Sequence, residues 1–500
     1  LRARELDPSV DVTVVVADAF PNFSICGLPY YLSGDVGDWR DLAHRTTADL
    51  EQAGIGLLPD HTAQAIDPAA KQVTVTSQHG ERQLGYDRLV IGTGAVPVRP
   101  PIDGLDLPGV QVLHTMADTF ALHHALAAGA QSAVIVGGGY IGLEMAEAFT
   151  ARGLDVTVVE QAPAVMPSVD LELGRLLGEE LRRHGVRVVN DVTVKAIHHD
   201  AGGLTVAGEP DFTATADLVL VVVGVRPDTQ LAVAVGVQTG VRGALRVDRR
   251  MRTNLPDVLA AGDCVETWHR LLKRPAYLPL GTTAHKQGRV AGETAVGGDR
   301  EFAGSLGTQV VKVFELAVAR TGLRDQEAAA AGLDPLTVAS TQFDHKAYYP
   351  GARQLYIRIT GDRTSGRLLG AQLVGDHRAE VAKRIDIPAN ALHPARRPSL
   401  DHPGRPIPSG CGDAPGGRAP PRLPQGRVRA TRRLRAGAGG HPATYPSIGS
   451  VSSGPDWTTS TSVAPTAASS KGGSTVWTST AASTRTPSAT RWPSATAHPG

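Results

Sequence analysis

The sequence is poor in cysteine, almost balanced in charge and free of long hydrophobic runs, and each of these features excludes a class of protein. Three cysteines in 500 residues exclude a fold held together by a disulfide framework. No stretch reaches the roughly 18 continuous apolar residues that a membrane helix needs. Lys and Arg (50) balance Asp and Glu (49), so no overall charge attracts nucleic acid or an anionic membrane. We expect a soluble, cytoplasmic protein with no nucleic-acid or membrane partner, and we predict no metal ligand.

The sequence does contain enough apolar residues for several hydrophobic cores. The hydrophobic fraction is 41%, and a chain of 500 residues has room for about two to four domains of ordinary size. Short apolar strands alternate with helical patterns along most of the chain, which predicts an α/β fold. The 56 glycines indicate many turns and close backbone approaches.

The strongest pattern is a glycine-rich turn between a strand and a helix at 132–161. Gly137 is predicted to make the tight turn, Gly139 to let the backbone approach a pyrophosphate, and Gly142 to let helix and strand pack closely. The free N–H groups at the start of the helix would bind the phosphates. In this strand–helix–strand context the pattern predicts a dinucleotide site, and an ordinary glycine turn would leave the acid at residue 160 unexplained.

Glu160 follows the second strand, eighteen residues after Gly142. It is expected to accept hydrogen bonds from the adenosine ribose hydroxyls and to repel a 2′-phosphate, which favours NADH over NADPH. Tyr140 and Ile141, within the glycine pattern, and Gly224, within the predicted strand 216–227, are predicted to contact the same cofactor.

Two further turns follow strands on either side of this segment. Thr93 and Gly94 lie in a small-residue turn, and Gly262 and Asp263 end another strand. An aspartate at the carboxyl end of a sheet strand, beside a glycine, can hold a ribityl or phosphate-linked hydroxyl. Each turn alone would be ordinary, but their spacing around a nicotinamide motif forms a pattern.

With these segments the chain resembles the FAD-dependent pyridine nucleotide–disulfide oxidoreductases. It is most similar to the single-cysteine branch that contains coenzyme A-disulfide reductase, NADH oxidase and NADH peroxidase. The resemblance covers about residues 1–393 and implies two Rossmann-like dinucleotide-binding domains, for FAD and NADH, and an α+β domain that forms a homodimer. It rests on five segments: 22–34, 91–97, 136–144, 260–266 and 279–292.

The resemblance implies roles for several residues. Gly262 and Asp263 would hold the ribityl–pyrophosphate region of FAD, together with the Thr93–Gly94 turn. Asp18 would replace the acid that the family carries at the end of an early strand. The segment from Thr282 to Gln287, which includes Thr283 and Ala284, would open the helix whose N-terminus faces the flavin.

Cys26 is the candidate redox residue. It precedes a predicted helix, and a helix N-terminus favours the reactive thiolate, so we expect a lowered thiol pKa. The two-cysteine branch of the family needs a second cysteine five residues later, where this chain has Tyr31. Cys264, in the turn of a buried strand, is predicted to be packing.

A single thiolate beside a flavin can form a mixed disulfide with a small thiol or a sulfenic acid with a peroxide. The acceptor is therefore predicted to be a disulfide such as coenzyme A disulfide, a persulfide or a peroxide. Tyr348 resembles the tyrosine that protonates the leaving thiolate in coenzyme A-disulfide reductases, and the alternative is an aromatic residue in an ordinary turn. A water-forming NADH oxidase and a non-catalytic NADH-binding remnant without FAD are the alternative functions.

The resemblance also raises expectations about the two ends of the sequence. The glycine loop for the FAD pyrophosphate would precede residue 1, and the family's last dimerisation segment would follow residue 393. After Pro394, arginine, proline, serine and threonine dominate. A disordered tail, a basic interaction tail and translation in another reading frame are the alternatives, and the abrupt change favours the last.

The predicted domain organisation divides the chain into five segments. The FAD-binding domain is split by an inserted NADH-binding domain, so its two halves are separate in the sequence. The order is a first FAD-binding segment (1–105), the NADH-binding domain (106–228), a second FAD-binding segment (229–302), the dimerisation domain (303–393) and a disordered tail (394–500).

Overall fold

The computed structural model describes residues 1–392, all of which fall in one compact unit. The predicted disordered tail lies outside these residues. Within residues 1–392, no helix is both long and apolar enough to cross a membrane.

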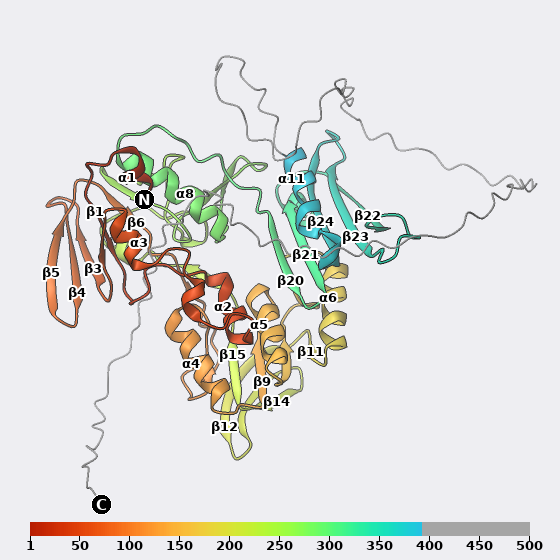
Figure 1. Ribbon diagram of the computed structural model, residues 1–500. Coiled ribbons are helices and arrows are strands. Elements are labelled where there is room, and N and C mark those ends of the chain that lie inside the picture. The colour runs from red at the N-terminus through yellow and green to blue at the C-terminus, as the bar shows by residue number, and fades with distance from the viewer. Residues whose placement is uncertain (393–500) are drawn as a thin grey trace, which may run out of the picture. The chain divides into compact units, whose positions relative to one another are not determined.

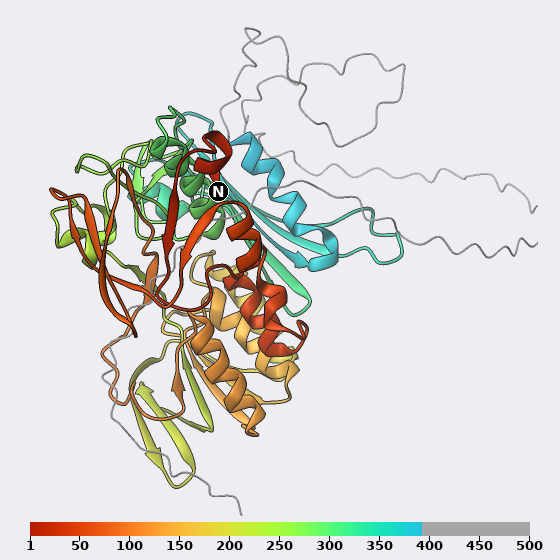
Figure 2. The same cartoon turned by 60° about the vertical axis from the view of Figure 1, so that its left-hand side comes forward.

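The central region of the chain is a three-layer α/β domain. Its parallel sheet has the order β11-β10-β9-β15-β8, with helices on one face and an antiparallel sheet, β12-β13-β14, on the other (Figures 1 and 2). Its elements are β8 (Val110–Gln111), α4 (Met116–Ala127), β9 (Ser132–Val136), α5 (Tyr140–Ala151), β10 (Asp155–Val159), α6 (Leu171–Arg183), β11 (Arg187–Val189), β12 (Thr193–Asp200), β13 (Gly203–Glu209), β14 (Phe212–Ala216) and β15 (Leu218–Val221).

The side chains of β9 alternate between the two hydrophobic cores of this domain. Ala133 and Ile135 pack with the helices α4, α5 and α6, whereas Val134 and Val136 pack with the small antiparallel sheet. Successive side chains of a strand point to opposite faces, so a continuously apolar strand is buried on both sides. The parallel sheet thereby holds the carboxyl end of β9 rigidly at the start of the glycine turn.

The segments predicted to bind FAD flank this domain in the sequence. Their parallel strands form two pairs, β1 with β2 and β17 with β6, in place of one continuous sheet over the described residues. The first segment contains α1 (Arg2–Leu6), β1 (Val12–Val15), the 3₁₀ turn η1 (Ile25–Gly27), α2 (Leu28–Ser33), η2 (Trp39–Leu42), α3 (Thr47–Gln52), β2 (Ile55–Leu58), β3 (Thr62–Asp67), β4 (Gln72–Ser77), β5 (Gly80–Gly85), β6 (Leu89–Ile91) and β7 (Ala95–Pro97). The second contains β16 (Val225–Pro227), α7 (Gln230–Val233), η3 (Val241–Gly243), β17 (Val258–Ala260), β18 (Thr267–His269), β19 (Arg274–Ala276) and α8 (Gly281–Ala295).

The chain passes twice between the segments predicted to bind FAD and the central domain, once after β7 and once before β16. The strands β7 and β16 pair antiparallel, and the N–H of Val98 donates to the carbonyl of Gly224 at 2.9 Å. This ribbon holds the Thr93–Gly94 turn beside the end of the central sheet.

The last described segment is a five-stranded antiparallel sheet of order β20-β21-β24-β23-β22, covered by the helices α10 and α11 (Figure 1). The strand β24 at the centre of this sheet is buried along almost its whole length. The helical segment after the sheet is interrupted at Ile385, between α10 and α11, and Pro388 lies inside α11. The elements are β20 (Gln309–Val313), β21 (Leu316–Gly322), α9 (Asp325–Ala330), β22 (Pro335–Phe343), β23 (Gln354–Asp362), β24 (Leu368–Asp376), η4 (His377–Ala379), α10 (Val381–Arg384) and α11 (Asp386–Ala391).

Candidate active site

The glycine turn has the geometry of a dinucleotide cradle. Gly137 has a φ of +110°, and a Cβ on Gly142 would lie 1.9 Å from the carbonyl oxygen of Gly137. Gly139 caps α5 with no side-chain hydrogen bond, and a Cβ there would meet no atom within 4 Å. The first N–H groups of a twelve-residue helix therefore open onto free space, which fits a pyrophosphate.

Glu160 lies at the carboxyl end of β10 and is buried. Its carboxylate accepts hydrogen bonds from the backbone N–H of Gly138 at 2.7 Å and of Ala162 at 2.8 Å. These bonds fix a negative charge beside the glycine turn, where the sequence placed the adenosine ribose.

The side chains of Tyr140 and Ile141 pack against the core that surrounds α5. The hydroxyl of Tyr140 donates to Gln309 of β20 and accepts from Ser168 at 3.0 Å. Because both side chains pack against protein, the predicted contact of Tyr140 and Ile141 with NADH would be made by their backbone groups. Gly224 has a φ of +109°, and a Cβ on it would meet nothing within 4 Å.

The Gly262–Asp263 turn follows β17 and is held by a buried glutamine of α8. Gln287 of α8 accepts from the N–H of Gly262 at 3.1 Å and donates to Thr267 at 3.3 Å. The carboxylate of Asp263 makes no hydrogen bond with any residue of the described range, and burial raises its pKa to about 6. A largely buried carboxylate without a donor fits a ribityl hydroxyl, so these residues fit FAD.

The start of helix α8 and the Thr93–Gly94 turn are the other segments predicted to bind FAD. Helix α8 begins at Gly281 without a side-chain cap; Thr282 is exposed, whereas Thr283 and Ala284 are buried. Thr93 donates to the carbonyl of Asp228 at 2.5 Å, and the N–H of Asp228 donates to Gly94 at 3.0 Å.

Asp18 and Cys264 are the two remaining residues that the sequence analysis discussed in the FAD-binding segments. Asp18 lies after β1 and accepts from the N–H of Phe20 at 2.8 Å; burial, and then the carboxylate of Asp60, raise its pKa. Cys264 is completely buried, which confirms it as packing, and burial raises its thiol pKa to about 11.

Cys26 lies in η1, directly before α2, and is exposed. The expectation of a lowered pKa is wrong. Although the residue as a whole is exposed, its sulfur is partly shielded from water, and this desolvation, followed by the carboxyl groups of Glu144 and Asp263, raises the pKa of the Cys26 thiol. Helix α2 is only six residues long, so its dipole is weak, and the charges of two acids from distant segments act on the sulfur.

Tyr348 lies far out in the loop between β22 and β23. Its ring is 76% exposed and stacks on Tyr349 at 5.4 Å. Within one chain it therefore has an open surface on which another molecule can pack.

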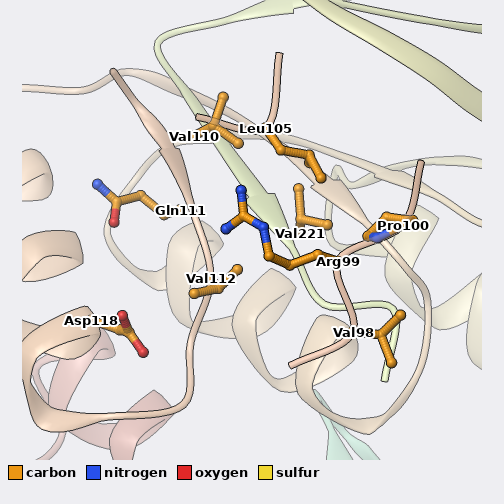
Figure 3. A pocket seen from close by; sticks show the side chains of 9 residues that line it. All are labelled: Val98, Arg99, Pro100, Leu105, Val110, Gln111, Val112, Asp118 and Val221. Atoms are coloured by element: carbon orange, nitrogen blue, oxygen red, sulfur yellow. The ribbon is translucent and has the colours of Figure 1, made fainter. Parts of the chain in front are cut away.

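The lining of one cavity does not include Cys26. It lies between the segment 98–105, β8 and β15, and the side chain of Arg99 reaches into it among apolar residues (Figure 3). Arg99 is paired with Asp106 at 2.6 Å. No residue predicted to bind a cofactor lines it, so it does not add to the site.

Comparisons with known proteins agree with this arrangement. Residues 1–288 match the family described as pyridine nucleotide-disulphide oxidoreductase, and residues 308–392 match the dimerisation domain of that family. A curated relative, the NAD(P)H coenzyme A polysulfide/persulfide reductase of Pyrococcus horikoshii, is 33% identical over 393 residues, covering 78% of this chain and 87% of the relative.

Two more relatives cover a similar range. The coenzyme A disulfide reductase of Staphylococcus haemolyticus is 29% identical over 78% of this chain and 87% of its own. The solved structure of an NAD-dependent persulfide reductase from A. fulgidus is 37% identical, with a TM-score of 0.75 over 78% of this chain and 73% of that one. The chain therefore belongs to the pyridine nucleotide-disulphide oxidoreductase family and is an FAD-dependent NAD(P)H oxidoreductase.

Proposed function

We propose that this enzyme passes electrons from NADH, by way of FAD, to the sulfur of Cys26 and then to a small disulfide or persulfide such as a coenzyme A derivative. The observation that carries the proposal is the setting of Cys26: it is an exposed cysteine directly before α2, and its sulfur is close enough to Glu144 of the NADH segment and Asp263 of the FAD segment for their charges to act on it. The other described cysteine, Cys264, is fully buried, so within residues 1–392 no second thiol is accessible for an internal disulfide. The relatives named as coenzyme A disulfide and persulfide reductases support this class of acceptor.

The chemistry at the sulfur follows from a single thiol. The Cys26 thiolate attacks one sulfur of R–S–S–R, so that a mixed disulfide forms and RS⁻ leaves. When bound, FAD supplies two-electron transfer between NADH and sulfur. Two electrons and one proton convert the mixed disulfide to RSH and the Cys26 thiolate, which completes the cycle.

Replacing Cys26 with serine tests this function. The Cys26→Ser enzyme is expected to bleach its flavin absorption on anaerobic addition of NADH like the parent enzyme, because the dinucleotide sites are intact. Its NADH-dependent reduction of coenzyme A disulfide should fall at least ~10³-fold, since the covalent step is lost. The matched control is Cys264→Ser, whose residue is buried packing.

Unchanged disulfide turnover in the Cys26→Ser enzyme would reject the proposal. Oxygen consumption without added disulfide would instead favour a water-forming NADH oxidase, a function supported by relatives such as the NADH oxidase of Enterococcus faecalis, which is 28% identical.

We further infer that NADH is preferred to NADPH. The buried carboxylate of Glu160 is fixed by two backbone N–H groups and would lie beside a 2′-phosphate. The ratio kcat/KM should therefore be about tenfold or more higher for NADH, and Glu160→Gln should narrow the difference. Equal values for the two cofactors in the parent enzyme would contradict this inference.

A homodimer belongs to the same proposal. Leu336, Val338 and Ile359 are exposed apolar residues on the paired strands β22 and β23. An exposed apolar face on a domain of the dimerisation family is suited to a second copy. In such a dimer Tyr348 would approach the partner subunit's Cys26 and protonate the leaving thiolate.

A further inference from the structure

The loop between β22 and β23 holds Tyr348 by contacts that the function proposed above does not explain. This loop runs from Asp344 to Arg353. Tyr348 is 76% exposed, and Tyr349 beside it is 54% exposed. Within the described part of the chain, no residue forms a hydrogen bond with the hydroxyl of Tyr348. Exposed aromatic rings at the tip of a loop are suited to contact with another molecule.

The carboxylate of Asp344 closes the base of this loop. It accepts hydrogen bonds from the backbone N–H groups of His345 and Arg353, each at 2.9 Å, so it joins the two ends of the loop. The N–H of Asp344 donates to the carbonyl of Arg353 at 2.8 Å. Arg384 of α10 donates to the carbonyl of Asp344, also at 2.8 Å. The side chain of Asp344 is only 7% exposed, so the base of the loop is fixed by largely buried contacts.

A series of contacts leads from this carboxylate to the ring of Tyr348. The Nδ1 atom of His345 lies 2.8 Å from Oδ1 of Asp344. The ring of His345 meets the ring of Tyr349 edge to face, with centroids 5.4 Å apart, and Tyr349 stacks on Tyr348 at 5.4 Å. An exposed tyrosine loses rotamer freedom when it is ordered, and these contacts order Tyr348 before any substrate binds.

We propose that Asp344 is a positioning residue for the proton transfer: through His345 and Tyr349 it holds the ring of Tyr348 in the orientation in which the hydroxyl reaches the leaving sulfur. The inference rests on the proposed function, in which Tyr348 protonates RS⁻ at the partner subunit's Cys26. In that step the phenol O–H bond breaks and the S–H bond of RSH forms. The tyrosinate then recovers its proton from water. A misplacement of about 1 Å in such a step can cost about 100-fold in rate.

The opposite end of β23 offers a matched control. Asp362 is buried in the turn that joins β23 to β24, and its carboxylate accepts from the backbone N–H groups of Ser365 at 3.0 Å and Asp334 at 3.2 Å. In the described part of the chain, no ring contact leads from this turn to Tyr348. A purely structural role predicts equal effects on turnover from Asp344 and Asp362. Positioning predicts an effect from Asp344 alone.

The test compares Asp344→Ala and Asp362→Ala in the full-length holoenzyme with NADH and coenzyme A disulfide. Asp344→Ala is expected to lower kcat about tenfold, because a misplaced proton donor slows the transfer. The KM for NADH and the bleaching of the flavin by NADH should be unchanged. Asp362→Ala should keep the parent kcat. His345→Ala changes a side chain that is 43% exposed, so it gives the same comparison if Asp344→Ala unfolds.

A double variant shows whether the effect passes through Tyr348. Tyr348→Phe alone should lower kcat about 100-fold, and adding Asp344→Ala to it should change kcat by less than about twofold, since no hydroxyl remains to be placed. Losses that multiply in the double variant overturn the inference, as do equal losses in Asp344→Ala and Asp362→Ala. Parent-like turnover of the Tyr348→Phe enzyme also overturns it. That outcome is separate from electron transfer through Cys26, which the Cys26→Ser enzyme decides.

Discussion

Replacing Asp170 with alanine is expected to lower the free energy of unfolding by about 3–5 kcal/mol, because it removes the buried partner of Arg358, whose side chain is only 16% exposed. Asp170 precedes α6 and accepts from Arg358 of β23 at 2.6 Å and from Gln372 of β24 at 2.8 Å. The N–H of Asp170 also donates to Gln372 at 2.8 Å. One side chain thus connects the central domain to the antiparallel sheet.

The matched control contacts the same arginine from the surface. Glu172 lies 3.4 Å from Arg358, but its side chain is 64% exposed. Glu172→Ala should cost no more than about 1 kcal/mol, since solvent screens such a pair. Denaturant unfolding of the two variants measures the difference; equal losses would show that the Asp170 network does not stabilise the fold.

Replacing Gly142 with alanine is expected to cost about 2–3 kcal/mol of stability, because the added Cβ would lie 1.9 Å from the Gly137 carbonyl oxygen. That oxygen belongs to the backbone and cannot move aside without shifting α5 from β9. The displaced helix would also lose its affinity for NADH.

Gly139→Ala separates the two effects within the same motif. Its φ is −81°, which alanine adopts easily, and a Cβ there meets no atom within 4 Å. Its unfolding midpoint should therefore equal that of the parent, while its Kd for NADH rises about tenfold or more, since the methyl group occupies the space of the pyrophosphate. Parent-like NADH binding by the Gly139→Ala variant would contradict the placement of the cofactor.

The two pairs of variants test different features of the molecule. The Asp170 network concerns how the central domain is attached to the antiparallel sheet, whereas the glycines concern one turn. The first prediction depends on a largely buried ion pair, and the second depends on a close backbone contact.

The sequence by itself determined the family, the α/β class and the strands and helix around the glycine turn. These features depend on residues that are close in the sequence. A glycine indicates a positive φ or a close backbone approach, and a run of apolar residues indicates a buried strand. Gly137, Gly142 and Glu160 could be placed from spacing alone, because a strand, a turn and a helix follow one another along the chain.

Only the tertiary structure decided what surrounds each reactive group. The pKa of Cys26 rises because burial and two carboxyl groups, Glu144 and Asp263, act on it, and these acids lie far away in the sequence. Gln287 supports the Gly262 turn from another element for the same reason. Local spacing carries no information about which distant side chains share a desolvated space, and an ionisable group depends on all of them.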